Sequence, residues 1–166
     1  MGEPIRTVAV LVANPALSSI LSMTLAGSPS LRVRPFDTQI ALMTYLHLAP
    51  ADLVVADFDS VASPADRLAA ELRADTQVSS RDLQIIALAS SLTAEAKAGS
   101  IHAGIDEIIM KPMSPKYLVE RVLARLARRE PRPVVRPERR SIRMRDWSAF
   151  GTNVIQLRPR EAQPLL

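Results

Sequence analysis

An aspartate and a lysine follow two apolar segments of this sequence at the points where the segments end. Asp57 comes directly after residues 52–56 (DLVVA), and Lys111-Pro112 follows residues 105–110 (IDEIIM). A carboxylate can attack phosphorus to form an acyl phosphate, and a nearby ammonium stabilises the negative charge that the new group adds. This pair of residues therefore predicts phosphoryl acceptance, provided that the fold brings the two side chains together.

Apolar runs alternate with helical patterns five times along the first 130 residues. The strands are expected at 7–13, 31–34, 52–56, 83–89 and 105–110. The first of them shows no polar alternation, which is typical of a strand buried on both faces of a parallel sheet. Because every parallel crossover needs a covering helix, we predict an α/β fold: a (βα)₅ flavodoxin-like, doubly wound parallel sheet of order 2-1-3-4-5, with an extended C-terminal arm.

The helices between these strands have recognisable start and stop residues. Asn14, Asp37 and Ser63 are expected as N-caps, since short polar side chains accept hydrogen bonds from the first helical N–H groups. Gly27 is expected to end the first helix, and the last helix is expected to open at Ser114.

The predicted strand order decides which residues meet. The first, third, fourth and fifth strands are contiguous in it, and sites in such sheets lie beyond the carboxyl ends of the strands. Asp57 and Lys111 are therefore expected to flank one cleft.

Three segments carry a family pattern: DLVVAD (52–57), LQIIALAS (83–90) and GIDEIIMKP (104–112). In this order they resemble the receiver domain of two-component response regulators, and the resemblance covers residues 5–130. It implies that Asp57 is the phosphoacceptor and that Lys111 contacts the phosphate. It also implies that Pro112 follows a cis peptide bond.

The chain departs from the family at the metal site. Receivers carry a pair of acids after the first strand that helps to bind Mg²⁺, and here those positions are Ala13 and Asn14. Mg²⁺ requires oxygen ligands and is usually bound through one or two carboxylates. Asp57, Asp59 and Asn14 are the candidate ligands that remain, and they predict a weak Mg²⁺ site at most. Asn14 is equally well explained as an N-cap, and Asp59 as a solvated turn residue.

Two further positions of the family pattern are altered. The hydroxyl residue that contacts the phosphoryl group corresponds to Ala89, with Ser90 next to it as a candidate phosphate contact. The aromatic residue of the fifth strand corresponds to Ile108. These changes predict an atypical receiver, in which Asp57 is phosphorylated slowly or only by a dedicated kinase.

The last 36 residues differ in composition from the rest. Residues 131–166 contain 8 of the 21 basic residues and 3 of the 17 acidic ones, and they begin with a proline-rich stretch. This basic tail is interpreted as a dimerisation or partner-docking arm, with residues 153–157 (NVIQL) able to add a strand to a sheet edge. A solvated extension and a polyanion-binding segment are the alternatives. No helix-turn-helix pattern is found in it, which argues against sequence-specific DNA binding.

The resulting expectation is a stand-alone, atypical response regulator. It would take a phosphoryl group from a sensor histidine kinase or phosphotransfer protein and act on a downstream protein, without being an enzyme beyond accepting and hydrolysing its own aspartyl phosphate. One alternative is a phosphorylation-independent pseudo-receiver that serves as an adaptor or scaffold. Another is a nucleic-acid-associated regulator that uses the Arg-rich tail. With no cysteine, no signal peptide and no run of about 20 apolar residues, a cytoplasmic protein without a membrane span is expected.

Overall fold

The computed structural model describes residues 4–128, and the predictions for residues 131–166 lie outside this range. Five parallel strands form one sheet of order β2-β1-β3-β4-β5, so the predicted fold class is confirmed. The strands are β1 (Arg6–Leu11), β2 (Leu31–Phe36), β3 (Leu53–Asp57), β4 (Gln84–Ala89) and β5 (Glu107–Met110). The helices are α1 (Pro15–Ala26), α2 (Gln39–Leu48), α3 (Ala65–Ala74), α4 (Ala94–Ala103) and α5 (Pro115–Ala127).

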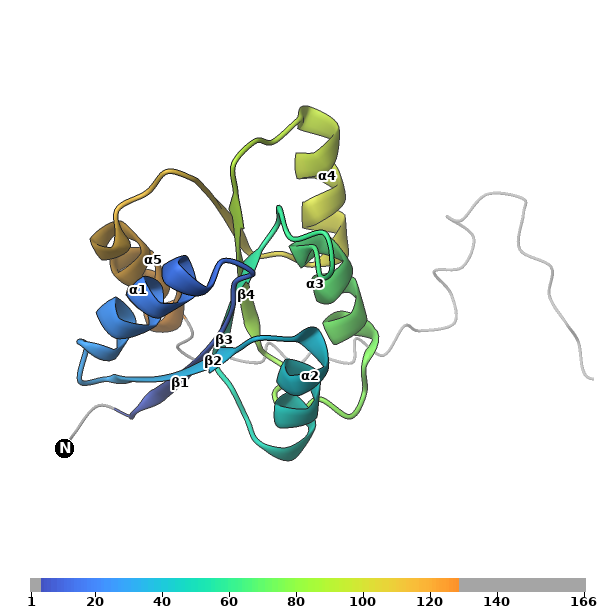
Figure 1. Ribbon diagram of the computed structural model, residues 1–166. Helices are drawn as coiled ribbons and strands as arrows, with labels where there is room; N and C mark the ends of the chain where they lie inside the picture. The colour runs from blue at the N-terminus through green and yellow to red at the C-terminus, as the bar shows by residue number, and fades with distance from the viewer. Residues whose placement is uncertain (1–3, 129–166) are drawn as a thin grey trace, which may run out of the picture. The chain divides into compact units, whose positions relative to one another are not determined.

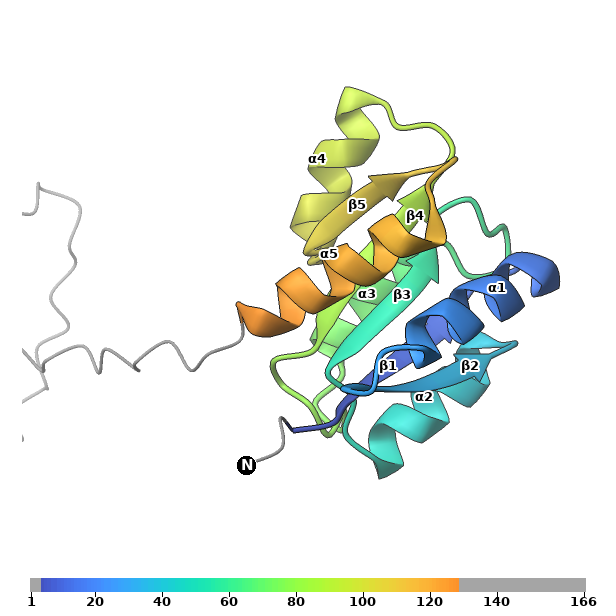
Figure 2. The same cartoon turned by 90° about the vertical axis from the view of Figure 1, so that its left-hand side faces the viewer.

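The helices cover both faces of the sheet. Helices α1 and α5 lie on one face, and α2, α3 and α4 lie on the other (Figure 1). Figure 2 shows α1 and α5 in front of the strands that they cover. Along β1, Val8 and Val10 pack with the α1–α5 layer, whereas Ala9 and Leu11 pack with the opposite layer. This alternation explains the unbroken apolar run, because both faces of the strand are buried.

The carboxyl-terminal limits of β1 and β2 differ from the predicted ones. β1 ends at Leu11 instead of residue 13, which leaves Ala13 and Asn14 in the turn before α1. β2 continues through Pro35 to Phe36 instead of ending before the proline. A proline is tolerated there because β2 is an edge strand. Proline has no N–H to donate, and at an edge strand this removes no hydrogen bond from the interior of the sheet.

Two predicted N-caps are wrong by one residue. Helix α2 is capped by Thr38, whose hydroxyl accepts a hydrogen bond from the Ala41 N–H at 3.2 Å, a contact for which Asp37 lies one residue too early. Helix α3 has Pro64 at the cap position, with no side-chain cap, and Ser63 lies outside it. Asn14 is an N-cap as predicted, and Gly27 ends α1.

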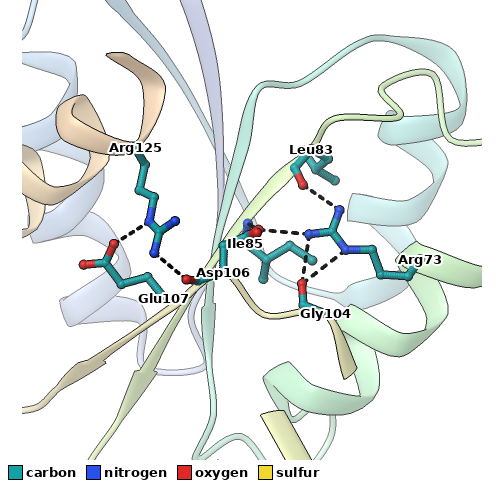
Figure 3. A network of polar contacts seen from close by, with 7 residues as sticks. All are labelled: Arg73, Leu83, Ile85, Gly104, Asp106, Glu107 and Arg125. Carbon is teal, nitrogen blue, oxygen red and sulfur yellow. Dashed lines mark hydrogen bonds and ion pairs between the residues drawn. The ribbon is translucent and has the colours of Figure 1, made fainter. Parts of the chain in front are cut away.

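Arg73 of α3 links the segments that lead into β4 and β5 (Figure 3). Its guanidinium donates to the carbonyls of Leu83, at 2.7 Å, and Gly104, at 2.8 Å, and to Asp106 Oδ2 at 2.9 Å. The same Asp106 oxygen accepts the Ile85 N–H at 2.7 Å. Gly104 has φ 95°, and a Cβ there would lie 2.7 Å from the Arg73 side chain, so glycine is required for both reasons.

The start of β5 is also held from the other face of the sheet. Glu107 forms ion pairs with Arg121 and Arg125 of α5. Figure 3 shows the pair with Arg125, which donates a further hydrogen bond to the Asp106 carbonyl. Burial opposes ionisation of Glu107, but the hydrogen bonds from the two arginines outweigh it and leave the pKa of Glu107 below its usual value. Asp106 and Glu107 are thus fixed from both helical layers.

Replacing Arg73 with alanine is expected to lower the free energy of unfolding by about 1–3 kcal/mol, because two carbonyls and one carboxylate lose a charged donor. Urea denaturation measures this loss. The matched control is Arg67→Ala on the exposed side of the same helix, which is expected to cost less than about 0.5 kcal/mol. Equal losses in the two variants would contradict a stabilising role for the Arg73 contacts.

Candidate functional site

Asp57 ends β3 and Lys111 directly follows β5, and these two strands flank β4. Asp57 is the last residue of β3, all five residues of which are buried. Backbone pairing continues past the strand ends: the Phe58 N–H donates to the Leu88 carbonyl, and the Lys111 N–H donates to the Ala89 carbonyl, each at 2.7 Å. The backbone around both residues is therefore fixed at the carboxyl edge of the sheet.

The two side chains meet across the end of β4, and Asp59 joins them. Lys111 Nζ lies 2.9 Å from Asp57 Oδ1 and 2.8 Å from Asp59 Oδ2. The Asp57 side chain is 7% exposed and that of Lys111 is 18% exposed, while Asp59 is 33% exposed. One ammonium thus neutralises a nearly buried carboxylate and a second carboxylate nearer the solvent.

The charges of this triad stabilise one another. Burial would lower the pKa of Lys111, but its hydrogen bonds to Asp59 and Asp57 outweigh this effect and raise the pKa above its usual value. The hydrogen bond from Lys111 holds the pKa of Asp59 below 3.8, against the opposing effect of burial. Both groups are therefore fully charged near neutral pH.

Ser90 reaches the same site through its backbone. Its N–H donates to Asp59 Oδ2 at 2.8 Å, so this oxygen accepts from both Ser90 and Lys111. The Asp59 N–H donates in turn to Asp57 Oδ1 at 3.1 Å. The ends of β3, β4 and β5 thus all contribute polar groups to one small site.

The residues present do not fit a Mg²⁺ ion well. The Asn14 side-chain oxygen caps α1 by accepting from the Ala16 and Leu17 N–H groups, at 3.0 and 3.1 Å, and Ala13 has no side-chain oxygen. Asp57 and Asp59 both pair with Lys111. Within residues 4–128 no group of three His, Cys, Asp or Glu side chains is placed to hold a metal ion. A cation bound by these two carboxylates would share them with the Lys111 ammonium, whose positive charge opposes its binding.

The remaining positions of the predicted site lie at the same edge. Ala89 is fully buried at the end of β4, and Ser90 beyond it is exposed. Ile108 is half-buried and packs against the layer of α2 and α3. The peptide bond between Lys111 and Pro112 is cis.

Sequence reasoning did not anticipate the contact between Asp59 and Lys111. The sequence predicts a turn residue or a metal ligand at Asp59, whereas its carboxylate pairs with the ammonium. A usable signal existed in the spacing, because Asp57 and Asp59 are two residues apart at the end of a strand whose carboxyl end lies at the same edge of the sheet as Lys111. The direction of a side chain in a loop does not follow from hydrophobic periodicity, which explains why the contact was missed.

Comparison with solved structures places the fold among receiver domains. The chain is similar to the chemotaxis protein CheY4 of Vibrio cholerae (TM-score 0.65, 16% identity, covering 72% of this chain and 98% of the other). It is similar to a CheY-like receiver domain of Methanospirillum hungatei (TM-score 0.66, 17% identity, 75% and 95%). A response regulator receiver protein of Pseudomonas putida gives a TM-score of 0.63 at 21% identity (75% and 98%).

No protein-family model and no curated protein matches the sequence. The structural comparisons establish that residues 4–128 have the receiver-domain fold, as the resemblance implied. No helix in this range is long and apolar enough to span a bilayer.

The triad predicts a pH dependence of stability. The pKa of Asp59 is lower in the folded chain than the value of about 3.8 expected on unfolding, so its contribution is complete above that value and is lost as the pH falls through the folded pKa. In Lys111→Met the largest cause of this lowered pKa is absent, and the hydrogen bond from Ser90 remains. Urea denaturation between pH 6 and pH 3 is expected to show a shallower acid-side loss for the variant than for the wild type.

At pH 7 the same variant is expected to lose about 1–3 kcal/mol, because the nearly buried Asp57 carboxylate is left without its charged donor. Lys97→Met, an exposed lysine on α4, is the control and is expected to follow the wild type at every pH. Parallel pH profiles for Lys111→Met and the wild type would show that Lys111 does not cause the lowered pKa of Asp59, and equal stabilities at pH 7 would show that the triad does not stabilise the fold.

Proposed function

We propose that the chain is an atypical response regulator in which Asp57 accepts a phosphoryl group from a sensor histidine kinase or a phosphotransfer protein. The single observation that carries this proposal is the contact between the nearly buried Asp57 carboxylate and Lys111 Nζ, at the carboxyl edge of a receiver fold. The output is a contact with a downstream protein, and the protein has no catalytic activity beyond accepting and hydrolysing the aspartyl phosphate. This role requires that the protein is located in the cytoplasm, where kinase domains can reach it.

The two oxygens of Asp57 suit different tasks. The hydrogen bonds that its side chain accepts from residues 4–128 both go to Oδ1, from Lys111 and from the Asp59 N–H. Oδ2 is the oxygen left for attack on phosphorus. The new P–O bond forms as the phosphorus–nitrogen bond of a phosphohistidine breaks, and the bonding electron pair stays with the imidazole. Lys111 then stabilises the charge that the phosphoryl group brings.

The altered positions lead us to propose slow transfer. Ala89 supplies no hydroxyl beside the phosphoryl group, so Ser90 is the candidate that remains for this contact. Asn14 and Asp59 would provide, with Asp57, only a weak Mg²⁺ site. A dedicated donor protein would compensate by orienting the phosphoryl group for in-line attack.

A second candidate function is that of a phosphorylation-independent adaptor or scaffold. It is favoured by one observation: Lys111 already neutralises Asp57 and Asp59, so the site is internally paired without a phosphoryl group or a metal ion. In this case the receiver fold serves only to present helical surfaces to partners.

Incubation with acetyl phosphate and MgCl₂, followed by intact mass spectrometry, separates the two functions. A response regulator is expected to gain the mass of one phosphoryl group over minutes to hours, and Asp57→Asn is expected to gain none. Lys111→Ala is expected to react at least about tenfold more slowly, since a lost charge-assisted contact of this kind is worth on the order of 1.4 kcal/mol.

Asp82→Asn, which changes an exposed aspartate just before β4, controls for the loss of one carboxylate. If the wild type gains no phosphoryl group from acetyl phosphate or from a phosphohistidine donor protein, the adaptor function is favoured. Rapid stoichiometric phosphorylation would contradict the slow transfer proposed here.

A further inference from the structure

The Asp59 carboxylate holds two hydrogen-bond donors that come from two different strand ends. Its Oδ2 lies 2.8 Å from Lys111 Nζ and 2.8 Å from the Ser90 backbone nitrogen. These donors follow β5 and β4, whereas Asp59 follows β3. An ammonium and a backbone N–H that converge on one carboxylate oxygen form a small anion-binding position.

This position adjoins the Asp57 carboxylate. Lys111 Nζ is shared between Asp59 Oδ2 and Asp57 Oδ1, and the Asp59 N–H donates to Asp57 Oδ1. A phosphoryl group bonded to Asp57 would carry its oxygens beside this carboxyl, where Lys111 is the nearest cation. Its oxygens and the Asp59 carboxylate would therefore compete for the same ammonium.

We infer that the Asp59 carboxylate occupies the anion-binding position formed by Lys111 Nζ and the Ser90 N–H, and thereby limits how fast Asp57 accepts a phosphoryl group. The second half of this inference rests on the proposed function, and the first half does not. Asp59 acts here as a positioning residue, because it acts through Lys111 and forms no bond to phosphorus.

The burial of the three side chains fits a contact that can be displaced. Asp57 is 7% exposed and fixed at the end of β3, whereas Asp59 is 33% exposed and lies in the loop that follows. Asp59 can therefore move into solvent when a more highly charged anion arrives. Until it moves, the Asp59 carboxylate is a negative charge next to the approaching phosphoryl group. The two negative charges repel each other, which slows the transfer.

The first measurement compares phosphorylation rates by intact mass with acetyl phosphate as the donor. Asp57 Oδ2 attacks phosphorus, the bond between phosphorus and the acetyl oxygen breaks, and acetate leaves with the electron pair. Asp59→Asn keeps the shape but loses the charge, and Asp59→Ala removes the side chain. Both are expected to react about tenfold faster than the wild type, with Asp59→Ala at least as fast as Asp59→Asn.

Asp82→Asn is the charge-matched control, because it removes one carboxylate at the amino ends of the strands, away from the site. It is expected to leave the rate unchanged. A merely structural role for Asp59 would give the opposite sign, since destabilised variants would react more slowly or not at all. If wild-type and Asp59 variants are phosphorylated at equal rates, the inference is overturned and the proposed function survives.

The second measurement does not depend on phosphoryl transfer. Inorganic phosphate is titrated into each protein, and binding is followed by the NMR shift of the Ser90 amide. Asp59→Ala is expected to bind phosphate about tenfold more tightly than the wild type, with no such change in Asp82→Asn. If no variant is phosphorylated by acetyl phosphate or by a phosphohistidine donor protein, but Asp59→Ala binds phosphate more tightly, the proposed function fails and the occupied anion position stands. If Asp59→Ala binds phosphate no more tightly than the wild type, the inference that Asp59 occupies this anion-binding position is overturned.

Discussion

A carboxylate that is nearly buried at the end of a central strand needs a cation, and Lys111 supplies it. Removing a charge from water without a partner is unfavourable by several kcal/mol. The partner reaches Asp57 only because β3 and β5 both flank β4 and run in the same direction. This one ion pair depends on the strand order, on the backbone pairing beyond the strand ends and on the contacts that fix the start of β5. The sheet is thus the support for a single charge contact between two distant parts of the sequence.

Much of this architecture follows from the sequence because it depends on period and order. Unalternated apolar runs predict strands buried on both faces, and the helices between them allow only parallel connections. The helix limits depend on individual hydrogen bonds instead. Thr38 caps α2 because its hydroxyl accepts the Ala41 N–H, whereas Asp37 lies one residue too early for this contact. Pro35 was expected to end β2, and it remains inside the strand because that strand lies at an edge. Local rules failed where the position of an element in the sheet mattered more than its composition.

The site was partly predictable for the same reason. Asp57 ends β3 and Lys111 directly follows β5, so the strand order alone brings them to one edge. The Asp59 contact depends on how a loop turns after β3, and the Arg73 contacts depend on carbonyl groups of Leu83 and Gly104, which every residue type carries. Backbone acceptors leave no signature in a sequence. What remained invisible was therefore the set of polar contacts that hold the strand ends in place, although the two principal residues were found.

The shortness of β5 has a consequence of its own. This strand has four residues, and charges hold it at both ends: Glu107 is paired with two arginines of α5, and Lys111 follows the last residue. Successive side chains of a strand face opposite sides of a sheet. A deletion or insertion of one residue between these ends would turn the lysine away from the aspartates while the arginines kept the first residue in place. β5 is in this sense a spacer of fixed length, and its residue count is constrained more tightly than the identity of its apolar side chains.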